Sequence, residues 1–364
     1  MADADVATRA PESDAAEDRI ASSPATPTPE AALGSTSAHT NKGDAASASA
    51  GPKLCDNCVT DRPTPIERQP AKSFGAPADL HVNQHRLQVY ISKPSDYPHA
   101  SARLLLLLTG GTGMLSTNNQ IQADMYADEG FVVVMPDLFG GDVAPNAATI
   151  AEAQDEEGAG GPSFLDLFKI KAVETAKSFM IDMWLARHTE AKVLPLLYRV
   201  LDAARDEFAD ALSSGGGVYA AGYCFGGRYV LLLAGDKTAS TATPMADTQD
   251  VGGSTNANAN ATIRQQSPLI KTGVIAHATL VSPDDFKGLQ VPISMVCVES
   301  DPMFPDAVRM AGEDYMSEHN IEHEVHVYPG VPHGFAVVGD YADESIQRAQ
   351  ATAFDQMLKW LKTH

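Results

Sequence analysis

The chain has few cysteines and few basic residues, and each shortage excludes a class of protein. Four cysteines among 364 residues cannot build a disulfide scaffold, so a reducing compartment such as the cytoplasm is expected. Lys and Arg number 26 against 47 Asp and Glu, which gives a formal net charge of −21. Nucleic-acid binding requires clustered Lys and Arg, so we expect no nucleic-acid partner.

Long hydrophobic runs are also missing. The longest one lies near Leu104 and is too short to cross a bilayer, so no membrane partner is expected. The N-terminal sequence MADADVATRA has neither the basic region nor the apolar region of a signal peptide, and its acidity disfavours a mitochondrial transit peptide. We therefore predict a cytoplasmic protein.

Metal and nucleotide motifs are missing as well. There is no HExxH and no paired metal-ligand spacing, and the loop Gly110-Gly111-Thr112-Gly113 lacks the GK[ST] ending of a P-loop. We expect no metal and no cofactor. Convergence of His and Asp side chains from distant loops on a metal is the alternative that sequence leaves open.

Composition divides the chain into a tail, a linker and one large domain. Residues 1–50 are rich in Ala, Ser, Pro and Asp, which predicts a disordered acidic tail because too few apolar side chains offset the entropy of ordering. Residues 51–79 form a linker that contains the CxxC of Cys55 and Cys58. Residues 80–364 form the domain, with low-complexity insertions at about 143–163 and 238–266.

The CxxC has no neighbours that would make it a redox or zinc site. Pro63 and Pro65 follow where a redox motif would have a helix, and no second CxxC could complete a zinc site. We interpret Cys55 and Cys58 as a non-catalytic pair, with a facultative disulfide as the alternative.

Strand and helix patterns alternate through the predicted domain. Apolar runs indicate buried strands at 103–109, 131–135, 273–278 and 292–298, with further strands at 86–92 and 322–328. Amphipathic patterns indicate helices at 118–129, 164–188, 191–212, 305–318 and 343–361. This alternation predicts an α/β fold, a three-layer α/β/α sandwich around a mostly parallel sheet.

The stretch Val218–Gly235 has the pattern of a nucleophile elbow with cysteine in the serine position. Cys224 lies in Gly222-Tyr223-Cys224-Phe225-Gly226-Gly227, between an apolar run and a helical pattern. The glycines allow a sharp strand-to-helix turn, and the N-terminus of the following helix favours a thiolate. A buried cysteine in a glycine-rich turn is the alternative.

Asp301 and His333 follow Cys224 in the order nucleophile, acid, base that α/β-hydrolases use, and each comes after a predicted strand. Loops at the ends of parallel strands share one edge of a sheet, so the three can meet there as a catalytic triad. The N–H of Phe225 and an N–H of Gly110 or Gly111 are the expected oxyanion donors.

Each member of this predicted triad has a competing interpretation or a competing residue. Asp301 precedes a proline and could be a turn former or a helix cap. Three other histidines are available as the base, namely His277, His323 and His326. Cys297 lies within an apolar strand and is interpreted as an inert core residue.

Four segments resemble the dienelactone hydrolase family, in particular its fungal-type members. They are the elbow 222–227, the segment Pro136-Asp137-Leu138-Phe139-Gly140-Gly141-Asp142, Glu299-Ser300-Asp301 and Pro332-His333-Gly334-Phe335. The resemblance covers about residue 80 to the C-terminus without the two insertions. It implies the α/β-hydrolase fold, a Cys-Asp-His triad and hydrolysis of a lactone or enol ester such as 4-carboxymethylenebut-2-en-4-olide.

Two departures separate the chain from the family pattern. Family members usually have an acidic residue near the cysteine just after the first core strand, where this chain has Thr109-Gly110. They also have an arginine soon after the histidine that holds the substrate carboxylate, where this chain has Ala336-Val337-Val338. Arg228, beside the elbow, is not an obvious substitute.

These observations predict a cysteine-dependent hydrolase of a lactone or small carboxylic ester, acting on a small-molecule substrate through an acyl-enzyme. The alternative is a catalytically silent hydrolase-fold protein that acts in binding or scaffolding, which the missing carboxylate keeps open. Sequence does not indicate the oligomeric state.

Overall fold

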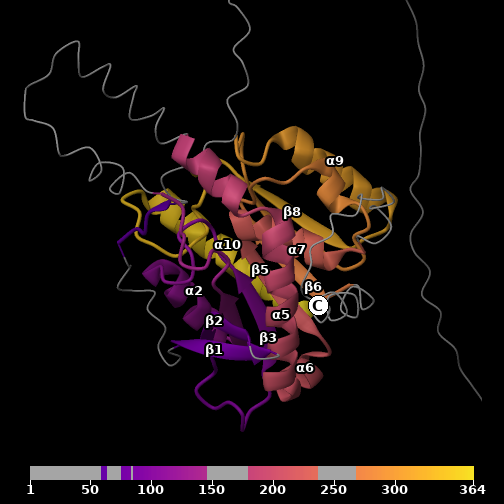
Figure 1. Ribbon diagram of the computed structural model, residues 1–364. Helices are drawn as coiled ribbons and strands as arrows, with labels where there is room; N and C mark the ends of the chain where they lie inside the picture. The colour runs from indigo at the N-terminus through magenta and orange to yellow at the C-terminus, as the bar shows by residue number, and fades with distance from the viewer. Residues whose placement is uncertain (1–58, 64–74, 83–84, 146–178, 237–267) are drawn as a thin grey trace, which may run out of the picture. The chain divides into compact units, whose positions relative to one another are not determined.

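An eight-stranded sheet runs through the protein in the order β1-β2-β4-β3-β5-β6-β7-β8 (Figure 1). The computed structural model describes residues 59–63, 75–82, 85–145, 179–236 and 268–364, all within the unit Ser49–His364. The strands are β1 Ala76–Val82, β2 His85–Ser92, β3 Arg103–Leu108, β4 Phe131–Pro136, β5 Val218–Tyr223, β6 Thr272–Ala276, β7 Ile293–Val298 and β8 His323–Tyr328. The helices are α2 Thr117–Asp128, α5 Glu190–Glu207, α6 Ala209–Gly215, α7 Phe225–Ala234, the 3-10 helix η2 Pro283–Phe286, α9 Asp306–Glu318 and α10 Glu344–Thr363.

The sheet is parallel from β4 to β8 and antiparallel only at the β1 and β2 edge. β1 pairs with β2 and β2 with β4 in antiparallel register, whereas the pairs from β3·β4 through β7·β8 are parallel. Parallel strands place their carboxyl ends at one edge, so the loops after β3, β5, β6, β7 and β8 come together there. The predicted, mostly parallel sheet is confirmed.

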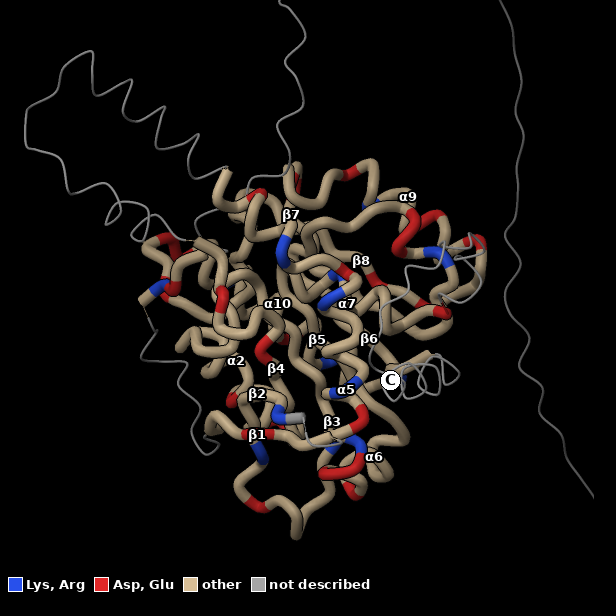
Figure 2. Tube along the Cα trace, viewed as in Figure 1, with Lys and Arg blue, Asp and Glu red and all other residues tan. Residues whose placement is uncertain are grey.

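Alternate side chains of the leucine run in β3 enter two different cores. Leu104, Leu106 and Leu108 belong to a core shared with α5, α7 and α9. Leu105 and Leu107 belong to a second core, shared with α2 and α10. Because successive strand side chains point to opposite faces, a continuous apolar run indicates helices on both sides. The predicted three-layer arrangement is therefore confirmed. In agreement with burial on both faces, strands β3 to β7 contain almost no charged residues (Figure 2).

Two features differ from the predicted elements. The pattern at 191–212 forms two helices, because Phe208 leaves the helical conformation with φ −120° and ψ 43° and buries its ring in the core. The edge strand β1 was not expected, since its exposed and buried residues do not alternate clearly. Several predicted segments lie outside the described residues, namely the second insertion, residues 146–163 of the first insertion, and Cys55 and Cys58. Within the predicted helix 164–188, residues 179–187 are described and are helical.

Residues 59–63, within the predicted linker, pack against the start of α2. Val59 is buried in the core with α5 and α7. Asp61 accepts hydrogen bonds from the Ser116 hydroxyl and from the Thr117 N–H at 2.9 Å, which satisfies donors at the N-terminus of α2. A carboxylate there is also favoured by the helix dipole. This segment is therefore attached to the domain through Asp61.

We expect Asp61→Ala to lower the free energy of unfolding by about 1 kcal/mol, as for loss of an N-terminal helix cap. Chemical denaturation monitored by circular dichroism measures the change. Asp314→Ala, at an exposed position in α9, is the matched control and should unfold like the wild type. Equal stability of Asp61→Ala and the control would show that the Asp61 contacts contribute nothing.

Candidate active site

Cys224 sits at the turn between β5 and α7 in a strained backbone conformation. Its φ of 49° and ψ of −114° lie outside the regions that non-glycine residues ordinarily adopt. Three backbone hydrogen bonds hold it. The Cys224 N–H donates to the Ala276 carbonyl at 3.0 Å, and its carbonyl accepts from the N–H groups of Gly227 at 3.0 Å and Thr279 at 3.1 Å. The sulfur therefore has a fixed position relative to the loop after β6.

Gly222 and Gly226 are required by close backbone packing at the elbow. A Cβ on Gly222 would lie 2.6 Å from the Gly226 carbonyl oxygen. A Cβ on Gly226 would lie well inside 3.0 Å of the Leu108 carbonyl group, at the end of β3. The N–H of Gly226 also donates to the Thr109 carbonyl at 3.0 Å. The elbow is thus pressed against the loop that follows β3.

Asp301 and His333 meet from the loops after β7 and β8. The Nδ1 atom of His333 lies 2.6 Å from Oδ2 of Asp301, and both side chains are buried. The other carboxylate oxygen of Asp301 accepts the Met303 N–H at 2.9 Å. This second bond orients the carboxylate, so that Asp301 can set the orientation of the imidazole.

Cys224 completes the arrangement, because its side chain interacts with the buried His333 ring. Burial by itself would lower the pKa of His333, but the hydrogen bonds to Asp301 and Cys224 and their negative charges outweigh it and raise the pKa to about 10. These contacts favour the charged form of the ring. The structure thus brings together the three residues that the sequence order suggested.

Gly110 lies against Cys224, at the position where a family carboxylate was expected. A Cβ on Gly110 would be 3.1 Å from the Cys224 Cβ and 3.6 Å from its sulfur. Any side chain here would touch the thiol, so the glycine leaves His333 as the charged partner of Cys224. The carbonyl of the next residue, Gly111, accepts the Ala144 N–H at 2.9 Å, which ties this loop to the segment after β4.

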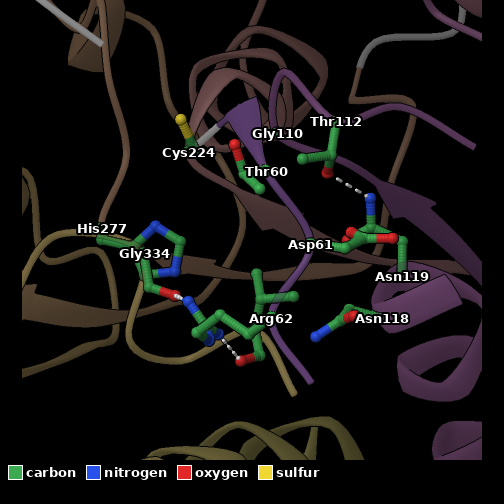
Figure 3. A pocket seen from close by; sticks show the side chains of 11 residues that line it. Thr60, Asp61, Arg62, Gly110, Thr112, Asn118, Asn119, Cys224, His277 and Gly334 are labelled. Atoms are coloured by element: carbon green, nitrogen blue, oxygen red, sulfur yellow. Dashed lines mark hydrogen bonds between the residues drawn. The ribbon is translucent and has the colours of Figure 1, made fainter. Parts of the chain in front are cut away.

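A pocket with both polar and apolar lining opens beside Cys224 (Figure 3). Its lining residues are Thr60, Asp61, Arg62, Gly110, Thr112, Asn118, Asn119, Cys224, His277, Gly334 and Val337. They come from the 59–63 segment, the loop after β3, the start of α2 and the loops after β5, β6 and β8. The pocket therefore lies at the carboxyl edge of the sheet, where ligands bind in open α/β folds.

Arg62 reaches the loop after His333, which sequence reasoning had not placed near it. Its guanidinium donates to the Gly334 carbonyl at 3.4 Å and to the Val337 carbonyl, and it lies 4.3 Å above the centre of the Tyr341 ring. No pattern in the sequence pointed to this residue, because it stands in an irregular, proline-rich stretch. Its position follows from the docking of residues 59–63 on the domain.

The competing residues occupy other environments, with one exception. His323 and His326 lie on β8, and the Nδ1 atom of His323 lies 2.7 Å from the Ile321 carbonyl oxygen. Cys297 is buried in the core, and burial raises its pKa to about 12. The guanidinium of Arg228 binds the carboxylates of Asp285 and Glu190. Neither Cys297 nor Arg228 lines the pocket beside Cys224. The exception is His277, which lines the pocket next to His333.

Within the described ranges, no group of three or more His, Cys, Asp or Glu side chains is arranged to hold a metal ion. None of the described helices has the length and hydrophobicity needed to cross a membrane.

Comparisons with known proteins show the family and the fold. The model of the dienelactone hydrolase family matches residues 88–364. The hydrolase pyvD of Aspergillus violaceofuscus is 25% identical over 76% of this chain and 87% of its own length. The hydrolase tropI of Talaromyces stipitatus is 25% identical over 80% of this chain and 92% of its own. A crystal structure described as a dienelactone hydrolase from Klebsiella pneumoniae matches with a TM-score of 0.53 and 14% identity, covering 80% of this chain and 99% of that one, and shows the same fold.

We expect Gly226→Ala to lower the free energy of unfolding by roughly 2 kcal/mol or more, because the new methyl group would force the elbow away from β3. Denaturant unfolding measures the loss. Gly130→Ala is the control: Gly130 has a φ of 94° and open space around it, so only backbone strain applies, roughly 1 kcal/mol. A Gly226→Ala protein as stable as the control would contradict close packing at the elbow.

Proposed function

We propose that this chain, which belongs to the dienelactone hydrolase family, hydrolyses lactones or small carboxylic esters with Cys224 as its nucleophile. The observation that carries the proposal is the meeting of three side chains at one edge of the sheet. His333 lies 2.6 Å from Asp301, and Cys224 interacts with the same buried ring. Nucleophile, base and orienting acid in this relation are the parts of an acyl-transfer site. Family membership supports hydrolysis in general, and the site supports the cysteine mechanism.

In the proposed first half-reaction, the Cys224 thiolate attacks the carbonyl carbon of the ester or lactone. The carbonyl electrons move to oxygen, and the resulting oxyanion accepts hydrogen bonds from the N–H of Phe225 and from an N–H of the Gly110-Gly111 loop. Phe225 is suited to this role because its N–H belongs to the first turn of α7, where N–H groups lack intrahelical acceptors. The carbon–oxygen bond of the leaving group then breaks, and the His333 imidazolium protonates the departing alkoxide.

In the second half-reaction, neutral His333 takes a proton from a water molecule, whose oxygen attacks the thioester carbonyl. The carbon–sulfur bond breaks, and the thiolate and imidazolium form again beside Asp301. Each proton removed from water or donated to the leaving group passes through the Nε2 atom of His333, because Nδ1 is bound to Asp301. The cycle consumes one water and one ester and needs no metal or cofactor.

The resting state in this proposal is a thiolate–imidazolium pair. A carboxylate at position 110 would touch the sulfur and disfavour the thiolate, and glycine removes that repulsion. Interactions with Asp301 and Cys224 raise the pKa of His333 to about 10 against the effect of burial, which favours the imidazolium. Cys224 is therefore expected to be nucleophilic at neutral pH and also prone to oxidation to a sulfenic acid.

The proposed substrates are lactones and small esters, and they do not include the family's dienelactone, 4-carboxymethylenebut-2-en-4-olide. The loop after His333 has Ala336 and Val337 where the family pattern has an arginine. The guanidinium in this pocket comes from Arg62, which is bound to the carbonyls of Gly334 and Val337.

We expect 4-nitrophenyl acetate or a small lactone to be hydrolysed by the wild type, with kcat/KM reduced at least about 10³-fold in Cys224→Ala, because the nucleophile is removed. Release of 4-nitrophenol, or acid release from the lactone, measures turnover. Cys297→Ala is the control and should retain activity, since Cys297 is a buried residue of the core. No turnover over a broad panel of esters and lactones by folded wild type would favour the silent binding protein instead.

The thiolate–imidazolium pair predicts the pH dependence of Cys224 alkylation. In the wild type, the rate of iodoacetamide modification should rise with a midpoint at least two pH units below the free-thiol value of about 8.5, because His333 is already protonated there and stabilises the thiolate. In Asp301→Asn, the imidazolium loses its anionic partner, so the midpoint should move upward. Peptide mapping by mass spectrometry assigns the modification to Cys224, and a wild-type midpoint near 8.5 would refute the pair.

A further inference from the structure

His277 is a buried histidine of the pocket that the proposed reaction leaves without a role. It follows β6 directly, and its N–H donates to the Val296 carbonyl at 2.8 Å. Its side chain is only 1% exposed, and neither ring nitrogen has a hydrogen-bond partner among the described residues. Buried polar groups are ordinarily satisfied, so a ring with two unsatisfied nitrogens indicates a missing partner.

The backbone of His277 is also strained, with a φ of 36°. Non-glycine residues with positive φ are uncommon, and they persist where the surrounding structure holds them, often at functional sites. The preceding residue, Ala276, accepts the N–H of Cys224 at 3.0 Å. The strained turn therefore places the imidazole in a fixed relation to the nucleophile, within the same pocket.

The surroundings of the ring disfavour its charged form. Its centre lies 5.0 Å from that of His333, 5.9 Å from that of Tyr223 and 6.2 Å from that of Phe335. Burial, followed by the positive charge of His333, lowers the pKa of His277 well below the ordinary histidine value. A neutral imidazole has one N–H donor and one acceptor nitrogen.

A second unsatisfied group lines the same pocket. The Nδ2 atom of Asn118 donates to the Val338 carbonyl, while its Oδ1 atom is buried and has no hydrogen-bond partner among the described residues. Figure 3 shows the His277 ring below Cys224, with Asn118 among the other labelled lining residues. Two buried polar side chains from different parts of the chain thus line the same pocket as the thiol.

We propose that His277 binds a hydroxyl group on the acyl part of the substrate, which makes hydroxy esters or hydroxy lactones the preferred class. A hydroxyl matches a neutral imidazole because it also has one donor and accepts hydrogen bonds. A carboxylate only accepts, so it would leave the acceptor nitrogen of His277 and the Asn118 oxygen unsatisfied. The inference rests on the proposed function in one respect: the acyl group is taken to approach Cys224.

Stable amides test this preference without requiring turnover. Glycolanilide carries a hydroxyl where propionanilide carries a methyl group, and the two are nearly the same size. The concentration of each that halves the rate of Cys224 alkylation by iodoacetamide measures its binding. We expect glycolanilide to protect wild-type Cys224 at a concentration roughly 3–10-fold lower than propionanilide, as one neutral hydrogen bond implies.

The variant His277→Phe keeps a ring but has no hydrogen-bonding nitrogen, so the preference for glycolanilide should disappear. His326→Phe is the matched control: His326 is an exposed residue on β8, and its loss should leave the wild-type preference in place. Equal protection by the two amides in the wild type would overturn the proposal, whether or not His277→Phe folds. Stronger protection by the anionic malonic acid monoanilide would also overturn it. Failure of the ester panel would instead count against the proposed hydrolysis alone.

Discussion

The strained turn at Cys224 is the constraint on which the site depends. The cysteine adopts φ 49° because Ala276 and Thr279 hold its backbone from one side. On the other side, Gly226 packs against the end of β3 with no room for a side chain. The same contacts therefore fix the nucleophile, bring the loop after β3 beside its sulfur and set the position of His277. Relaxing this turn would displace the thiol from all of these neighbours together.

The pKa values of the two buried histidines of the site, His277 and His333, depend on the residues around each ring. Both histidine rings are buried, and burial favours the neutral form of each. Asp301 and Cys224 raise the pKa of His333, whereas His277 has no hydrogen-bonded carboxylate among the described residues and faces the His333 ring. The pKa values of the two rings, whose centres lie 5.0 Å apart, are therefore shifted in opposite directions. One is suited to proton transfer and the other to hydrogen bonding with an uncharged group.

Local pattern predicted the elements that are buried on both sides. The leucine run of β3 and the apolar segments of β4, β6 and β7 have the composition of central strands, and their bounds agree with the structure within a few residues. Elements whose form depends on distant contacts were harder to predict. The break between α5 and α6 arises where Phe208 turns into the core, and β1 exists because β2 offers it a hydrogen-bonding edge. Neither cause is visible in the local sequence.

By itself, the sequence determined the order Cys224, Asp301, His333 and the glycine frame of the elbow, because these depend on spacing and on local backbone chemistry. Only the tertiary structure decided what surrounds them. It placed Thr60, Asp61 and Arg62 in the pocket, and it selected His277 from several histidines as the neighbour of His333. Such neighbours come from segments far apart in the chain that meet at one edge of the sheet. Their proximity therefore depends on strand order and loop packing, which no short stretch of sequence contains.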